Sequence, residues 1–379
     1  MTAASEQQGK PADVIERIHA SGCQCVIALT GGGSVAIPSL LSVPGASASI
    51  LEAAVPYSEG ALAAWLGGKF DHACSEPTAR AMAMAGFERA RKFAVEGADL
   101  RMLRGIGATA SLVSNRPKRG PHRVHVAWQS PAATVAYSCE LTKGKRARQE
   151  EEAVAAELVL HAVAEACGVV NTPPRPPSPD EPVSRRQKLA PQEWTELLLG
   201  ARQSVQYRIA GTPRAVFSGA FNPLHDAHRR MAELASARLS VPVAMELSIV
   251  NVDKPTLDFL EIESRLAALG DFPVVLTRAP TFIEKAALMP GVVFVVGADT
   301  IARIADEKYY GGDRQKRDSA IAGIASRGCR FLVFGRVCDG RFVLPSELGL
   351  PSQLRAMCDE VPANVFRFDI SSTELRSES

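Results

Sequence analysis

Hydrophobic positions in the first 170 residues follow two periods in turn, and this alternation predicts helices and strands. Apolar residues recur at helical spacing over residues 12–18, whereas residues 25–29 form the short apolar run of a buried strand. A glycine-rich segment at 30–34 follows this run and leads into a second helical stretch that includes residues 39–41. A strand, a glycine loop and a helix in succession favour a backbone site for an anion, although glycine turns end many strands of α/β proteins.

The end of this region has the pattern of a hairpin followed by a helix. Residues 123–129 and 134–141 are rich in β-branched and aromatic side chains, and a Ser-Pro turn between them predicts an antiparallel pair. Basic residues at 143–148 and glutamates at 150–152 then precede an amphipathic helix over residues 153–166. Acidic groups stabilise a helix N-terminus, so we interpret these charges as a solvated helix start rather than an RNA-binding patch.

Proline marks a boundary after this helix. Six prolines fall between residues 171 and 182, where neither a helix nor a central strand can form. We therefore predict an α/β domain over residues 1–170, an extended semi-rigid linker over 171–190, and a second α/β domain over 191–379. A helix over residues 193–203 is expected to pack ahead of the second domain.

Composition narrows the class of protein. The chain has 379 residues, 46% hydrophobic and 22% charged, as expected for a soluble globular protein of two domains. A net charge of +2 gives no bulk attraction to nucleic acid or to a membrane, and no apolar run reaches spanning length. The first residues lack the layout of a secretory signal. The eight cysteines are scattered without a CxxC motif, which favours the reducing cytoplasm.

The most informative stretch follows a short apolar run at residues 214–216, which we interpret as a buried strand. Residues 217–228 read FSGAFNPLHDAH, and good helix formers come next, so a strand passes through a Gly/Pro turn into a helix N-terminus. Helix N-termini attract phosphate because their first N–H groups lack partners and the helix dipole is positive there. Gly219 lets backbone approach a ligand, and His225 and His228, three residues apart, share one helix face.

The pattern G-x-F-N/D-P-x-H-x-x-H resembles the ATP-binding signature of HxGH-type nucleotidylyltransferases, and it looks most like that of nicotinamide mononucleotide adenylyltransferases. Gly219, Phe221, Asn222, Pro223 and the two histidines all match, while Asp226-Ala227 stands where the family often has glycine. Two other interpretations are a zinc-binding histidine pair, for which no neighbouring ligand cluster completes a tetrahedral set, and a solvated helix start. The family implies a Rossmann-like parallel sheet for residues 191–379.

Further strands are predicted at residues 243–252, 273–277, 292–296 and 329–334, with a helix over 261–269. The run at 292–296 is apolar throughout and must be buried. Gly297 and Asp299 follow the carboxyl end of this run. The segment Gly297–Asp299 resembles the G-x-D segment that lines the family's nucleotide site. Asp299 is expected to bind a ribose hydroxyl, to cap the next helix, or both. Near the end, the sequence ISSTELR matches the family's second signature, I-S-S-T-x-I/L-R.

The resemblance implies AMP transfer from ATP, accompanied by Mg²⁺, to a mononucleotide, with nicotinamide or nicotinic acid mononucleotide as the first choice and pyrophosphate as the second product. It assigns no protein ligand to a metal. A different phosphate acceptor, or a regulatory protein that binds or hydrolyses ATP, stays open because Tyr309 and Tyr310 occupy the region where the family often has a tryptophan. The residues implied on the triphosphate are His225, His228, Lys254 and Arg376, and those implied in nucleotide binding are Ser218, Gly219, Phe221, Asn222, Gly297, Asp299, Ser371, Ser372 and Thr373.

The first domain resembles the competence-damage-inducible C-terminal domain, whose active members deamidate nicotinamide mononucleotide. The matching segments are residues 30–32, 43–47, 56–58 and 74–83. Ala28 stands where the family has serine and Leu62 where it has lysine, so a nucleophile would have no local base. We therefore expect the fold without the amidase activity; a phosphate site in the glycine loop, a scaffold and a dimerisation module stay open as roles.

Overall fold

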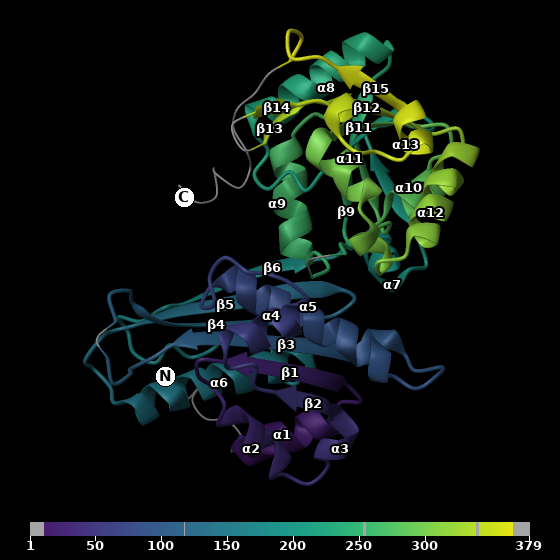
Figure 1. Cartoon of the computed structure of the whole chain (residues 1–379). Helices are drawn as coiled ribbons and strands as arrows, with labels where there is room; N and C mark the ends of the chain where they lie inside the picture. Colours follow the sequence, from purple (N-terminus) through teal and green to yellow (C-terminus); the bar gives the residue numbers. More distant parts are fainter. Residues whose placement is uncertain (1–10, 117, 253–254, 339–340, 367–379) are drawn as a thin grey trace. The chain divides into compact units, whose positions relative to one another are not determined.

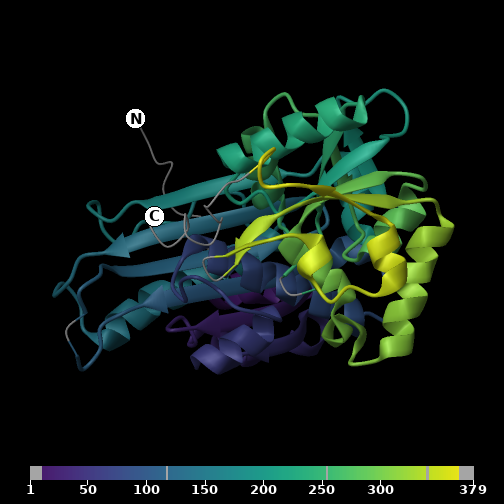
Figure 2. The same cartoon turned by 45° about the horizontal axis from the view of Figure 1, so that its top comes forward.

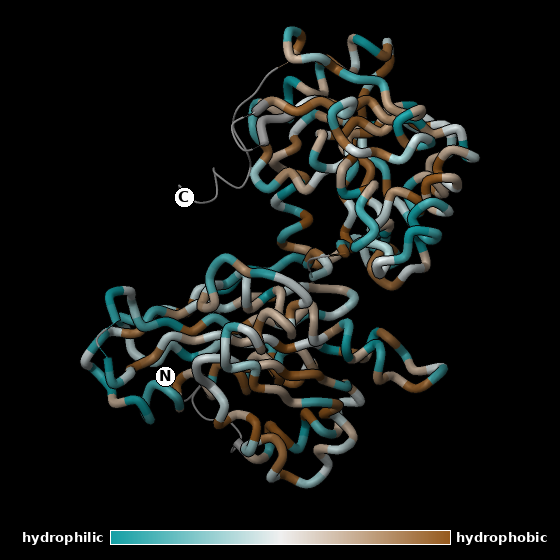
Figure 3. Tube along the Cα trace, viewed as in Figure 1, coloured by the Kyte–Doolittle hydropathy of each residue, from teal (hydrophilic) through white to brown (hydrophobic). Residues whose placement is uncertain are grey.

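The computed structural model describes residues 11–116, 118–252, 255–338 and 341–366, and the chain forms two compact units. The first unit runs to Thr195 and also takes in Asp253–Leu260, whereas the second holds Glu196–Val252 and the chain from Glu261 onward. The chain therefore passes between the units at three points, after residues 195, 252 and 260. Hydrophobic residues follow the central strands of each unit (Figure 3).

The first unit is built on a six-stranded mixed sheet in the order β2-β1-β3-β4-β5-β6. Strands β2, β1 and β3 are parallel, and β3 to β6 form an antiparallel block that both views show side by side (Figures 1 and 2). The strands are β1 (Gln24–Thr30), β2 (Ile50–Ala54), β3 (Leu103–Ser111), β4 (His122–Gln129), β5 (Ala133–Leu141) and β6 (Val183–Leu189). The helices are α1 (Pro11–Ala20), α2 (Ala36–Leu41), α3 (Ala46–Ser49), α4 (Glu59–Leu66), α5 (Glu76–Phe93) and α6 (Arg148–Ala166), with a short 3-10 helix at Leu100–Met102.

Helices cover both faces of this sheet. On one face α6 packs on a core that includes Ile27, Val126 and Tyr137, and on the other α5 packs on alanine and glycine positions of β3 to β5. Two glycines of β3 explain how closely α5 approaches: a Cβ at Gly105 would lie 1.9 Å from the Ala83 carbonyl oxygen. The predicted strand at 25–29 and the predicted hairpin are present as β1 and as β4 with β5.

The linker is shorter than the sequence predicted. Residues 183–189, placed in the spacer over 171–190, form β6, which pairs with β5 along its whole length. Strand β6 reads VSRRQKL and is exposed at most positions, so it carries no hydrophobic signal and is held by main-chain pairing at a sheet edge. The proline-rich stretch 171–182 does precede it without helix or strand, and the first unit continues to Thr195 rather than ending at residue 170.

The second unit is a Rossmann-like α/β layer structure with a seven-stranded sheet in the order β15-β12-β11-β8-β9-β10-β7. All neighbouring pairs are parallel except β10 with β7. The strands are β7 (Ser204–Tyr207), β8 (Ala215–Ser218), β9 (Val243–Ser248), β10 (Val274–Thr277), β11 (Val293–Gly297), β12 (Arg330–Phe334) and β15 (Cys358–Val361), with a separate hairpin of β13 (Arg336–Cys338) and β14 (Arg341–Val343). The helices are α7 (Gln192–Leu199), α8 (Asp226–Leu239), α9 (Phe259–Leu269), α10 (Phe282–Leu288), α11 (Ala298–Ala305), α12 (Arg314–Ser326) and α13 (Ser352–Ala356), with 3-10 turns η2 (Glu307–Tyr310) and η3 (Pro345–Glu347).

The predicted fold class is confirmed, with local differences. The helix predicted over 193–203 ends at Leu199, because Gly200 adopts a positive φ of 87° and the chain then enters edge strand β7. The strand predicted over 243–252 ends at Ser248. Strands β7 and β15 were not predicted. No helix within the described ranges has both the length and the apolar content needed to cross a membrane.

Candidate functional site

Strand β8 occupies the place where the strand order of the second unit reverses. It lies between β9, the next strand along the chain, and β11, which the chain reaches only after β10. In open parallel sheets, ligands bind outside the carboxyl ends of the strands at such a switch point. The loop at 219–225 after β8 and the start of α11 after β11 both lie at this carboxyl edge of the sheet. Both belong to the nucleotide site that the sequence predicted.

The loop after β8 is a tight turn built around one glycine and one buried ring. The Gly219 N–H donates to the Glu246 carbonyl oxygen at 3.1 Å, and a Cβ at Gly219 would come within 2.7 Å of the Phe221 ring. Phe221 has a φ of 48° and is 2% exposed, with its ring edge-on to those of Phe217 and His228. The structure thus places Phe221 beneath the loop, where it supports His228 rather than presenting its face to a ligand.

The two histidines meet at the start of α8. His225 is the N-cap residue and His228 the third residue of the helix, and their rings stack with centroids 3.7 Å apart. The His225 N–H donates to His228 Nδ1 at 3.3 Å, so Nδ1 acts as an acceptor and the ring proton lies on Nε2. That Nε2–H can donate to an anion. The helix N-terminus and two imidazoles therefore converge at one place, as the spacing predicted.

Helix α9 supports the same loop through Glu261 and Arg265; the family resemblance pointed to Arg265, with a surface salt bridge as the alternative. Arg265 Nη1 donates to the Ala220 carbonyl oxygen at 3.1 Å, and its Nη2 lies 2.8 Å from Glu261 Oε1. Asn222 Nδ2 donates to the same Glu261 oxygen at 3.4 Å, so Asn222 is tied to α9 through its side chain. The i,i+4 spacing of Glu261 and Arg265 is a helix signal, but nothing local indicates that Arg265 reaches a loop 45 residues earlier.

Ser218 is the last residue of β8, and its hydroxyl oxygen is buried without a hydrogen-bond partner among the residues that the structure describes. Ser218 pairs in register with Glu246 of β9, directly before Gly219. A buried hydroxyl without a partner costs free energy in most places, so its position at the switch point favours a role in the site.

The second segment of the site begins at Gly297, the N-cap of α11. A Cβ there would lie 2.7 Å from Asp299 Oδ1, so the carboxylate folds back over the glycine at the helix start. Asp299 is the second residue of α11, and α11 follows β11, the strand adjacent to β8, so Asp299 lies at the same carboxyl edge of the sheet as the histidines. Among the tyrosines considered for base stacking, Tyr310 donates its hydroxyl to the Ile304 carbonyl oxygen at 3.1 Å, and Tyr309 has the Lys308 ammonium over its ring.

Several predicted residues lie outside the described residues: Lys254, Ser371, Ser372, Thr373 and Arg376. Within the described ranges, no group of three or more His, Cys, Asp or Glu side chains could hold a metal ion.

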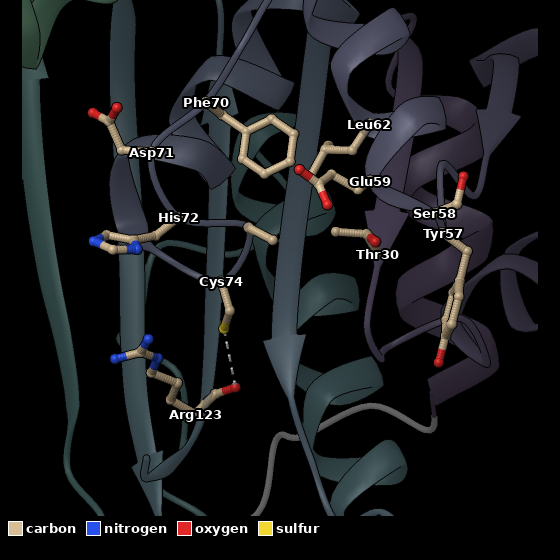
Figure 4. A pocket seen from close by; sticks show the side chains of 11 residues that line it. Thr30, Tyr57, Ser58, Glu59, Leu62, Phe70, Asp71, His72, Cys74 and Arg123 are labelled. Atoms are coloured by element: carbon tan, nitrogen blue, oxygen red, sulfur yellow. Dashed lines mark hydrogen bonds between the residues drawn. The ribbon is translucent and has the colours of Figure 1, made fainter. Parts of the chain in front are cut away.

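The first unit has a cavity of about 400 Å³ at the end of β1 (Figure 4). Leu62 and Phe70 form an apolar wall, and Ala28 lies with Leu62, Leu66 and Met82 in one apolar cluster. Where the amidase family has serine and lysine, this chain therefore has packed hydrocarbon. The lining residues are Thr30, Tyr57, Ser58, Glu59, Leu62, Phe70, Asp71, His72, Ala73, Cys74 and Arg123.

Cys74 lines this cavity, and its surroundings favour the neutral thiol. Burial raises the pKa of the Cys74 thiol despite the opposing effect of Arg123. The thiol donates to the Arg123 carbonyl oxygen at 3.9 Å (Figure 4). A thiol, unlike a thiolate, is a weak nucleophile.

The glycine loop of the first unit is already occupied by a carboxylate from α6. Glu152 accepts from the Ser34 hydroxyl at 2.9 Å and from the Val35 N–H at 3.4 Å. Burial would raise the pKa of Glu152, but the hydrogen bonds from Ser34 and from the N–H groups of 33–35 hold it below its ordinary value. The phosphate site considered for residues 30–34 is therefore filled from within the fold.

We expect the full chain to release no ammonia from nicotinamide mononucleotide. Leu62 can neither take a proton nor hold an anion, and Ser47 is exposed on α3 and does not line the cavity. Coupled detection of ammonia at high enzyme concentration, without ATP, measures this directly. Steady release that disappears in Ser47→Ala would show that Ser47 has found another base and would end this interpretation.

A partly buried histidine of β4, His125, makes the first unit sensitive to acid. Burial, aided by the charge of Arg123, lowers the pKa of His125 to about 4, and its Nδ1 lies 2.7 Å from Ser138 Oγ. In the unfolded chain the pKa of this histidine is about 6.5, so as pH falls the unfolded state takes up the proton before the folded state does. The contribution of neutral His125 to stability is therefore present above about pH 6.5 and is lost as pH drops toward 4.

After discounting for solvent screening, we expect His125 to cost about 1–2 kcal/mol of unfolding free energy between about pH 7 and about pH 4.5. Urea unfolding at the two pH values measures it, with His125→Gln expected to flatten the dependence and the exposed His72→Gln to leave it unchanged. Equal pH dependence of the wild type and His125→Gln would contradict the assignment.

Comparison with solved structures finds matches that each cover just under half of the chain. A competence/damage inducible protein, CihA, of Agrobacterium tumefaciens is 19% identical, with a TM-score of 0.34, and the match covers 43% of this chain and 98% of that one. A CinA superfamily protein of Klebsiella pneumoniae is 17% identical over 42% of this chain and 99% of the other, with a TM-score of 0.33. A CinA superfamily protein of Escherichia coli is 17% identical, and the match covers 45% of this chain and 93% of that one, with a TM-score of 0.30.

We transfer no residue role from these similarities. No protein-family model matches the chain. No curated protein matches it in sequence.

Proposed function

We propose that the second unit transfers AMP from ATP to the phosphate of a mononucleotide and releases pyrophosphate. The observation that carries the proposal is the convergence of two stacked imidazoles, His225 and His228, on the N-terminus of α8 at the switch point of a parallel sheet. This arrangement attracts phosphate and suits a reaction in which charge moves over phosphate oxygens. Nicotinamide or nicotinic acid mononucleotide is the acceptor that the sequence resemblance favours.

The reaction requires no covalent enzyme intermediate. An acceptor phosphate oxygen forms a bond to the α-phosphorus while the bond between that phosphorus and the bridging oxygen breaks, and pyrophosphate leaves with its magnesium. The His228 Nε2–H and the imidazole of His225 would donate to the triphosphate oxygens as charge builds on them. Asp299 lies where it could accept from a ribose hydroxyl, and Glu261 with Arg265 holds the loop in shape. Catalysis then consists of positioning and charge stabilisation.

A different phosphate acceptor is the second candidate, and one observation favours keeping it. The Tyr310 hydroxyl donates to the Ile304 carbonyl oxygen, and burial raises its pKa. This hydrogen bond fixes Tyr310, and the structure gives no such bond for the Tyr309 hydroxyl among the residues that it describes. Adenylyl or cytidylyl transfer to phosphopantetheine or to a sugar or alcohol phosphate would use the same triphosphate residues with another acceptor pocket.

The test is to incubate the full chain with Mg²⁺, ATP or CTP, and a panel of phosphate acceptors, and to identify products by mass. A dinucleotide formed from nicotinamide or nicotinic acid mononucleotide supports the proposal. A product with another acceptor replaces it with the second candidate. Formation of ADP and phosphate, or tight ATP binding without any product, would instead show a regulatory nucleotide-binding protein.

A further inference from the structure

The loop that follows β1 in the first unit has the backbone form of an anion-binding nest. Gly31 and Gly33 have positive φ values of 77° and 83°, and such turns bring successive N–H groups to one side of the chain. A Cβ at Gly31 would lie 1.9 Å from a carbonyl oxygen of β3, so close packing on the sheet imposes this form. The last two residues of the loop, Ser34 and Val35, are exposed, so the nest is open to solvent.

A carboxylate already lies in this nest, which is direct evidence that the loop accepts an anion. As described above, Glu152 accepts from the Ser34 hydroxyl and from the Val35 N–H. The N–H groups of Gly33 and Ser34 contribute as well. Glu152 belongs to α6, 117 residues after Val35, so this anion is supplied by the fold and not by the loop itself.

The carboxylate satisfies this set of donors only in part. Glu152 Oε2 is buried and has no hydrogen-bond partner in the described part of the chain, and the nearest cation, Arg148 Nη2, lies 3.5 Å away. Arg148 Nη2 also donates to the Gly31 carbonyl oxygen at 3.1 Å, which keeps the guanidinium beside the loop. A phosphate group has three terminal oxygens and more charge than a carboxylate, so it suits several N–H groups, a hydroxyl and a guanidinium better.

We propose that the loop at 31–35 is a binding site for a phosphate group, free or as a monoester, and that Glu152 is its built-in occupant. An external phosphate must displace a carboxylate that the same chain holds in place, and such an intramolecular competitor acts at a high effective concentration. The wild-type loop is therefore closed to phosphate, and removal of the carboxylate opens it. This inference concerns the first unit by itself and does not depend on nucleotidyl transfer.

The experiment measures hydrogen exchange in the full chain at the amides of residues 33–35, with and without millimolar inorganic phosphate. Without phosphate, Glu152→Ala should lose about tenfold in protection, because these N–H groups lose their acceptor. Phosphate should restore that protection in Glu152→Ala and change nothing in the wild type. Glu157→Ala is the matched control, since Glu157 is exposed on the same helix, and it should behave as the wild type does.

A second variant tests which groups hold the phosphate. In the Glu152→Ala background, Ser34→Ala removes the hydroxyl donor and should raise the phosphate concentration needed for half-maximal protection about tenfold. Methyl phosphate is the second probe. Protection by both compounds identifies a site for the phosphate group of an organic ester, whereas protection by inorganic phosphate alone identifies a site for the free ion.

Three results would overturn the proposal: no effect of phosphate on residues 33–35 in a folded Glu152→Ala protein, the same effect in the wild type, or protection spread evenly over the whole chain. The first removes the site, the second removes the role of Glu152, and the third shows general stabilisation by salt. Should Glu152→Ala not fold, Glu152→Gln, which keeps the size of the side chain and removes its charge, should gain protection on adding phosphate. Unchanged exchange in Glu152→Gln would then reject the site.

Discussion

Replacing His225 with alanine is expected to lower nucleotidyl transfer by about 10²-fold or more, the loss typical of one preorganised group that stabilises charge in a transition state. His225 caps α8 and stacks on His228 with centroids 3.7 Å apart, so its imidazole lies at the positive end of the helix. Because part of its surface is open to solvent, removing the ring should cost little stability. Steady-state kinetics with ATP and the acceptor found by mass measure the effect.

The design of this experiment uses three further variants. His228→Ala should lose as much, and the double variant should lose less than the product of the two, because stacked groups on one anion act together. His72→Ala, an exposed histidine of the first unit, is the control and should retain full turnover. A folded His225→Ala protein with near-normal turnover would remove His225 from the site.

The strands differ in how far the sequence could predict them. Strand β11 reads VFVVG and is buried on both faces between parallel neighbours, so its unbroken apolar run is a clear signal. Strand β3 is equally buried but contains Gly105 and Gly107, which sequence patterns assign to turns. Those glycines are there because the α5 backbone comes too close for any Cβ, a reason visible only in three dimensions. Edge strand β6 is charged and has no apolar face to detect.

The site shows the same division between local and distant information. The position of His225 and His228 at a helix start follows from the twelve residues of the motif. The role of Phe221 does not, since only the fold shows that its ring turns under the loop at a positive φ. In the first unit, Leu62 predicts the loss of the amidase base, but nothing near residues 30–34 indicates that Glu152, 118 residues later, fills the loop. Contacts over such separations leave no local signal.

Buried charge beside the predicted site leads to the second large effect. Glu246 of β9 is fully buried; its Oε2 accepts from Lys285 Nζ at 2.6 Å and its Oε1 from Thr277 Oγ1 at 2.6 Å. The carbonyl oxygen of Glu246 holds the Gly219 N–H, so this residue connects the ion pair to the loop after β8. Such a pair adds little net stability over apolar residues of the same size, yet breaking it leaves an uncompensated charge in the core.

Lys285→Met is therefore expected to lower the free energy of unfolding of the second unit by about 3–5 kcal/mol. Adding Glu246→Leu should restore most of that loss, because the double variant removes both charges from the interior. Arg230→Ala, which breaks the exposed Arg230–Glu233 pair, is the control and should cost less than about 1 kcal/mol. Urea unfolding followed by circular dichroism measures all three. A loss below about 1 kcal/mol in Lys285→Met, or no recovery in the double variant, would show that the Glu246 carboxylate finds another partner when Lys285 is removed.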